Sequence, residues 1–195
     1  GVTMVGGILS SSGGGKFTAN GSAANFLDGV TLNGVLDLAT AFGIERIRNG
    51  ITLNGAVNVN NNSVLAFETT GTVGGTGTIV LGNTGPSNRI NLEGTGTTTL
   101  GANIVIRGEN GTIGGQDFVA GTNNLVNNGR ISADVSGGLI VLTPDVGTTN
   151  AGTLEAINGG TLRLNTAVTN TGSGHIDAGN LSNVVQNGVT ISGGT

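Results

Sequence analysis

Aliphatic residues recur along this chain in short alternating runs that are separated by glycine and asparagine. The most apolar runs closely follow a glycine and cover residues 36–38, 57–59, 79–81, 104–106, 140–142 and 162–164. Alternation over a few positions is typical of a strand with one buried face. The Asn-Gly, Gly-Gly and Asn-Asn pairs between the runs adopt turn conformations at little cost. The pattern therefore predicts many short β-strands joined by tight turns.

A longer unit repeats above this alternation. Residues 28–38 recur as residues 49–59, twenty-one positions later, and the opening of the unit returns at residues 187–195. An aliphatic position can be followed at steps of about 20 residues through Val30, Ile51, Val73, Leu92, Ile113, Ile131, Leu154, Ile176 and Ile191. Stacking pairs like segments with like, so we expect aliphatic ladders inside and Asn and Thr ladders at the corners. The prediction is an all-β, single-stranded parallel β-helix (β-solenoid) of about nine coils.

Asn-Gly between alternating segments is also the strongest short-range signal for an antiparallel hairpin. A meander or sandwich is therefore the alternative fold, and the repeated longer period favours the solenoid. We expect one domain over residues 1–195, with an irregular first coil or two in residues 1–27 and repeats in residues 28–195. Residues 39–47 tolerate a helix best and are expected to form a different turn or a small protrusion. The chain begins and ends within a unit, which predicts a segment of a longer shaft or a filament subunit.

The composition limits the kind of core that the chain can form and the classes of partner that it can bind. The chain has 39 glycines, five Phe, no Trp or Tyr, no Cys, and 9% charged residues with a net charge of −4. Such a core must be narrow and aliphatic, and disulfide and thiol chemistry are excluded. The seven basic residues are scattered singly, which argues against nucleic acid. No apolar stretch is long enough to span a bilayer, so this segment is not expected to insert into a membrane.

Several units share the form Asn-x-Gly-x-Leu/Ile, as in Asn150-Ala-Gly-Thr-Leu154 and Asn127-Asn-Gly-Arg-Ile131. They resemble the passenger and stalk repeats of secreted bacterial adhesins of the filamentous-haemagglutinin-like and autotransporter kinds, over roughly residues 28–195. The resemblance implies export to the bacterial cell surface, a right-handed parallel β-helix, and roles in adhesion, surface display or matrix building. It carries over no site residue.

Candidate chemistry is sparse. The eleven acidic residues form no cluster in sequence, although stacking can bring Glu93 near Glu109 or Asp134 near Glu155, as a polysaccharide-cleaving β-helix requires. His175 is the single histidine and, without cysteine, does not indicate zinc. We expect it to point outward from a strand. The sequence assigns no catalytic, cofactor-binding or metal-binding residue and no cofactor.

The segment Glu45-Arg46-Ile47-Arg48 concentrates charge more than any other. It is a candidate for binding an anionic sugar, together with Phe42, or a neighbouring chain, or else it is a solvated loop with a weak ion pair. The sequence as a whole predicts a structural, non-catalytic extracellular shaft or fibre segment of a bacterial surface or secreted protein. Its expected roles are adhesion, surface display or biofilm matrix, and its expected partners are further copies stacked end to end and host or matrix glycans. A polysaccharide-binding or polysaccharide-cleaving β-helix is the alternative.

Overall fold

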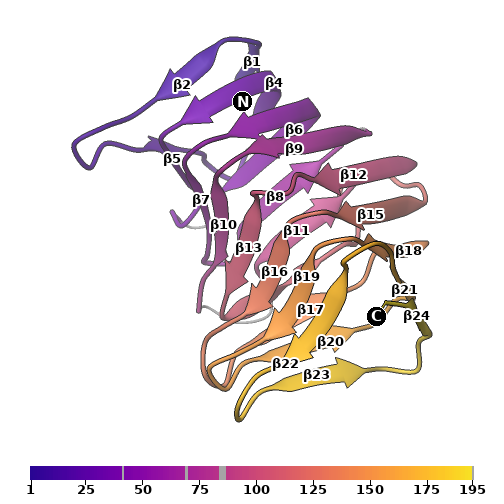
Figure 1. Ribbon diagram of the computed structural model, residues 1–195. Coiled ribbons are helices and arrows are strands. Elements are labelled where there is room, and N and C mark those ends of the chain that lie inside the picture. The colour runs from indigo at the N-terminus through magenta and orange to yellow at the C-terminus, as the bar shows by residue number, and fades with distance from the viewer. Residues whose placement is uncertain (41, 69, 84–86, 195) are drawn as a thin grey trace.

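The chain folds as a stack of parallel β-coils. The computed structural model describes residues 1–40, 42–68, 70–83 and 87–194, and no helix occurs within them. Figure 1 shows the coils following one another from the indigo amino-terminal end to the yellow carboxy-terminal end. Each full coil contributes one short strand to each of three faces. The predicted all-β parallel solenoid is confirmed, and its right-handedness stays a prediction.

The three faces are built from strands that recur in a fixed order. The first face contains β1 (Thr3–Val5), the start of β4 (Phe26–Asn33) and of β6 (Ile44–Leu53), β8 (Val64–Phe67), β11 (Arg89–Leu92), β14 (Asn110–Ile113), β17 (Leu139–Leu142), β20 (Thr161–Leu164) and β23 (Asn183–Gln186). The second contains β2 (Ile8–Ser10), the ends of β4 and β6, β9 (Gly71–Gly75), β12 (Gly96–Leu100), β15 (Asn123–Asn127), β18 (Gly147–Asn150), β21 (Val168–Asn170) and β24 (Ile191–Gly193). The third contains β3 (Phe17–Thr18), β5 (Val35–Asp37), β7 (Ala56–Val59), β10 (Thr78–Leu81), β13 (Val105–Gly108), β16 (Arg130–Ala133), β19 (Thr153–Ala156) and β22 (His175–Ala178).

Two long strands turn a corner without interruption. β4 and β6 join the first and second faces into one 16-stranded sheet, while the third face is an 8-stranded sheet. β4 bends at Gly29, where its register with β6 shifts, and β6 bends at Asn49 and Gly50. All three residues have positive φ, which glycine and asparagine adopt most readily. The Asn-Gly pair therefore bends a parallel strand here instead of closing an antiparallel hairpin.

The repeat predicted the register of the first coils. Val30 pairs with Ile51, and Ile51 pairs with Val73, as expected from the spacing. All three side chains are buried. Each buried aliphatic side chain of this size stabilises the fold by about 1.5–3 kcal/mol, so the ladder is a continuous source of stability along the shaft.

Beyond Val73 the ladder read from the sequence is wrong. Val73 pairs with Leu100, whereas Leu92 lies on the first face and pairs with Phe67. One later part of the series is a true column, on the third face: Ile131, Leu154 and Ile176. The coils also number about eight and average about 23 residues, which corrects the predicted nine of about 20. Longer connections cause the difference, notably residues 82–88 and 114–122.

Asparagine replaces aliphatic residues inside the second half of the shaft. The column of Leu100 continues as Asn127, Asn150 and Asn170. Asn127 Nδ2 donates to Asn150 Oδ1 at 2.8 Å, and Asn150 Nδ2 donates to Asn170 Oδ1 at 2.9 Å and to the His175 carbonyl at 3.1 Å. Buried amides are tolerated when they are hydrogen-bonded in this way. The expected asparagine ladder at a corner is confirmed.

Glycine is required where the chain of one coil crosses closely over the next. A Cβ on Gly152 would lie 2.0 Å from the carbonyl oxygen of Gly129, and a Cβ on Gly55 would lie 1.8 Å from that of Gly34. No side chain fits at such distances without moving the backbone. These glycines therefore allow the corner between the second and third faces to stack at the spacing of hydrogen-bonded strands.

Ala39, Thr40 and Phe42 form a turn, which was one of the two expectations for residues 39–47, whereas the charged part from Glu45 to Arg48 is a strand and not a solvated loop. β6 begins at Ile44 and pairs with β4 on one side and β8 on the other. Strand alternation turns Glu45 and Ile47 into the shaft and leaves Arg46 and Arg48 on its outer surface. Ala41, within the same segment, lies outside the described residues. At the amino-terminal end, β1, β2 and β3 stack on β4 and β5 as one coil.

Candidate functional site

The two candidate sugar-binding arginines are held in a cluster with aromatic rings. The guanidinium of Arg46 lies 4.6 Å from the ring centres of both Phe26 and Phe118, and that of Arg48 lies 3.7 Å from Phe26. Both arginines also form ion pairs with the buried carboxylate of Glu68. Cation–π contacts and ion pairs already engage both guanidinium groups, which a sugar acid would have to contact. The arrangement therefore joins β6 to its two neighbouring coils and to the loop that follows β14.

Phe42, the third residue predicted to bind the sugar, is not one of the rings that stack on the two arginines. It is 61% exposed in the connection between β5 and β6 and has a φ of 58°. Among the described residues, the rings stacked on Arg46 and Arg48 are Phe26 and Phe118. The sequence therefore located the arginines and missed their aromatic partners, one of which comes from a loop many residues away.

A buried carboxylate, that of Glu93, makes several of the contacts that hold this loop, residues 114–122, against the shaft. Glu93 is buried and accepts hydrogen bonds from the backbone N–H groups of Asp117, Phe118 and Val119 at 2.8–3.0 Å. Asp117 also forms an ion pair with Arg89 at 2.9 Å. Glu93 thus acts as a clamp for the loop.

The proposed pairs of acids are engaged with separate partners. Asp134 forms an ion pair with Arg107. Glu155 pairs with Arg130 and accepts a 2.6 Å hydrogen bond from Ser132. These contacts link successive coils, and each neutralises a carboxylate that would otherwise be buried without a partner.

His175 lies exposed on β22, near the carboxy-terminal end of the shaft, as expected. Its Nε2 is 3.3 Å from both Thr153 Oγ1 and Asp177 Oδ2, and its Nδ1 is 3.1 Å from the Ser173 carbonyl oxygen. No group of three or more His, Asp or Glu side chains suited to hold a metal ion occurs within the described residues. The same part of the chain contains no helix long and apolar enough to cross a membrane.

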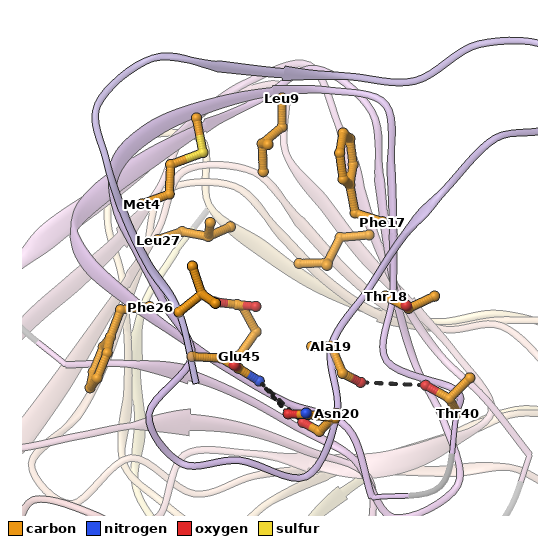
Figure 2. Close-up of a pocket in the computed structure, with 13 residues that line it drawn as sticks. Met4, Leu9, Phe17, Thr18, Ala19, Asn20, Phe26, Leu27, Thr40 and Glu45 are labelled. Carbon is orange, nitrogen blue, oxygen red and sulfur yellow. Dashed lines mark hydrogen bonds between the residues drawn. The ribbon is translucent and has the colours of Figure 1, made fainter.

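A pocket that combines apolar walls with a titratable group lies at the amino-terminal end of the shaft. This pocket of about 510 Å³ is lined by residues of the first three coils. Figure 2 shows the first coil passing around it, with Met4, Leu9 and Phe17 on one side and Glu45 opposite. In the sequence, Glu45 stands out only as part of the charged segment Glu45–Arg48. The alternation of β6 turns this carboxyl inward, which the assumed loop did not predict.

Glu45 is buried with a polar atom unsatisfied. The residue is 6% exposed, and its Oε1 accepts no hydrogen bond from the described residues. Burial raises the pKa of the Glu45 carboxyl to about 7, opposed by a smaller effect of the Arg46 backbone N–H. Asp37 on β5 differs: burial alone would raise its pKa, but Lys16 and the Ala39 N–H hold it below the ordinary value. Near neutral pH, Asp37 is therefore ionised, whereas Glu45 is protonated in a substantial fraction of the molecules.

Fold and sites together define a parallel β-solenoid repeat protein whose outer charges mainly join coil to coil. No family model, no curated protein and no solved structure matches this chain.

Proposed function

We propose that this chain is a structural, non-catalytic shaft or fibre segment of a bacterial surface or secreted protein. In this role it supports adhesion, surface display or biofilm matrix, and its coils stack end to end on further copies. The resemblance of its repeats to secreted adhesins motivates the extracellular setting. The stacking depends on the geometry of the two terminal coils.

The observation that carries the proposal is that the interior apolar columns run into partly exposed terminal coils. At the carboxy-terminal end, Ile176, Val184 and Ile191 continue the columns of buried Leu154, Leu162 and Val168. At the other end Met4, Leu9 and Phe17 are only partly buried. Strand edges with apolar side chains are favourable places for another strand to add by main-chain pairing.

The ion pairs between successive coils support the proposed structural role. Lys16–Asp37, Arg48–Glu68, Arg107–Asp134 and Arg130–Glu155 each connect one coil to the next. The carboxylates are buried but the cations are partly exposed, so solvent screening limits each pair to on the order of 1 kcal/mol. Their effect is to resist sliding of one coil over its neighbour, in addition to the ladder hydrogen bonds.

Sedimentation velocity and negative-stain microscopy over a wide concentration range test the proposal. We expect concentration-dependent rods for the unmodified chain and their loss in Val184→Lys, which places a charge on the carboxy-terminal coil. Val146→Lys is the matched control, since Val146 is 63% exposed on the side of the shaft. A monodisperse monomer, or rods unaffected by Val184→Lys in a folded variant, would refute the stacking.

An assay of polysaccharide turnover distinguishes the proposed shaft from the alternative, a polysaccharide-cleaving β-helix. A shaft releases no sugar from a panel of acidic and neutral polysaccharides. Sugar release that disappears in Asp134→Asn or Glu155→Gln would contradict the non-catalytic role and favour a cleaving β-helix.

A further inference from the structure

The pocket at the amino-terminal end has the composition of a small-molecule site. Its volume of about 510 Å³ lies within the range of about 300–1,000 Å³ typical of such sites. Its apolar wall is formed by eight side chains from the first two coils, among them Met4, Leu9, Phe17, Leu27 and Leu36. An apolar ligand body of moderate length would therefore be favoured by burial against this wall.

Two neutral polar residues that line the pocket, Asn25 and Thr40, already donate hydrogen bonds to other groups of the protein. Asn25 Nδ2 donates to Asn20 Oδ1 at 3.1 Å and to the Ile44 carbonyl at 3.0 Å. Thr40 Oγ1 donates to the Ala19 carbonyl at 3.3 Å. These bonds, two of which are drawn in Figure 2, close the corner of the first coil. Glu45 differs, because its buried Oε1 has no partner among the described residues.

No cation of the neighbouring strands neutralises Glu45. It is the one titratable side chain among the thirteen residues that line the pocket, all of which the structure describes. The charged residues on or beside the strands packed around it have other partners: Lys16 with Asp37, Asp28 with Asn49, and Arg46 and Arg48 with Glu68. A buried carboxylate without a counter-charge is unfavourable, and a hydrogen-bonded cation relieves that cost.

We propose that this pocket binds a small primary alkylammonium, whose ammonium group pairs with Glu45 while its alkyl chain packs on Met4, Leu9 and Phe17. An ammonium supplies both the missing charge and donors for Oε1. The ammonium binds the ionised form of Glu45, so the raised pKa of this carboxyl makes the affinity depend on pH. The affinity rises as pH increases through about 7, because Glu45 is then already ionised and does not have to lose a proton when the ligand binds.

Titration calorimetry or ligand-observed NMR with three six-carbon probes tests the site. Hexylammonium is expected to bind 1:1, with affinity increasing at least about tenfold from pH 5.5 to 7.5, as the ionised fraction of a group with a pKa near 7 increases. Hexanol and hexanoate are expected to bind at least about tenfold more weakly at pH 7.5. Equal binding of hexanol, or no measurable hexylammonium binding, would overturn the proposal.

Substitutions test whether Glu45 is the side chain that recognises the charge of the ammonium group. Glu45→Gln should weaken hexylammonium binding at least about tenfold and remove its pH dependence, while Glu109→Gln, the same change elsewhere on the shaft, should leave both unchanged. Unaltered binding by Glu45→Gln would contradict the assignment. If Glu45→Gln does not fold, the pH series and the neutral probe decide with the unmodified chain. Tighter binding of Nα-acetyl-lysinamide than of hexylammonium would overturn the small-molecule assignment in favour of a lysine side chain.

Discussion

Replacing Glu45 by glutamine should make the stability of the shaft less dependent on pH. In the folded chain, burial holds the pKa of Glu45 at about 7, whereas the ordinary value is 4.5. The folded state therefore retains its proton over a range in which the unfolded chain has lost it. As pH rises from about 4.5 to about 7, ionisation favours the unfolded state, and above pH 7 the effect is constant.

The size of the effect follows from the shift. One pKa unit corresponds to about 1.4 kcal/mol, so the shift of Glu45 lowers the free energy of unfolding by up to about 3 kcal/mol between pH 4.5 and pH 8. Asp37 has the opposite sign, because its pKa is lowered and its stabilising contribution is lost as pH falls below its ordinary 3.8. Its titration lies outside the window in which Glu45 acts.

Urea unfolding followed by far-UV circular dichroism measures this, since the chain has no Trp or Tyr for fluorescence. The informative quantity is the difference in unfolding free energy between Glu45→Gln and the unmodified chain at each pH. It should change by about 2–3 kcal/mol in favour of the variant from pH 4.5 to pH 8. Glu109→Gln is the control for the chemical change. A difference constant within about 0.5 kcal/mol would refute the burial argument.

Three further predictions concern the corners and the clamped loop. Asn150→Asp removes the amide donors and buries an acid, so urea unfolding at pH 7 should show a loss of more than about 2 kcal/mol. Gly152→Ala should cost more than about 2 kcal/mol because of its close carbonyl, whereas in Gly74→Ala, with its nearest contact at 4.0 Å, the change should stay within about 1 kcal/mol. Glu93→Gln should speed limited proteolysis of residues 114–122 at least about fivefold with the global stability little changed.

The sequence predicted the fold where coil length is constant. Residues 28–38 and 49–59 have the same length and turn residues, so Val30 and Ile51 were correctly paired. Further along, the strands still alternate with a period of two, but the connections between them change in length. A period of two carries no information about which face a strand joins. The pairing of Val73 with Leu100 therefore depends on connections whose path the local pattern does not specify.

Candidate sites were predictable as concentrations of charge but not as contacts. The segment containing Glu45 and Arg46 was singled out, yet its strand conformation was missed because residues 39–47 also suit a helix. Had the alternation of β6 been recognised, the inward carboxyl and the outward arginines would have followed. The stacking of Phe118 on Arg46 joins residues on different coils. Such a contact follows from the path of a long loop and leaves no local signal.

The pocket and the stacking surface overlap, and this relates the two proposals to each other. The two ends of the shaft differ: the amino-terminal coil surrounds the Glu45 pocket, whereas the last coil continues the Asn150 and Asn170 column. Because the two ends present different surfaces, we expect the proposed stacking to be head to tail. A coil added to the strands that carry Met4 and Leu9 would cover the pocket, so a bound alkylammonium and a stacked copy compete. Hexylammonium should shorten rods formed by the unmodified chain and leave those of Glu45→Gln unchanged. Rods equally sensitive to hexanol would contradict this competition, since hexanol lacks the charge that Glu45 recognises.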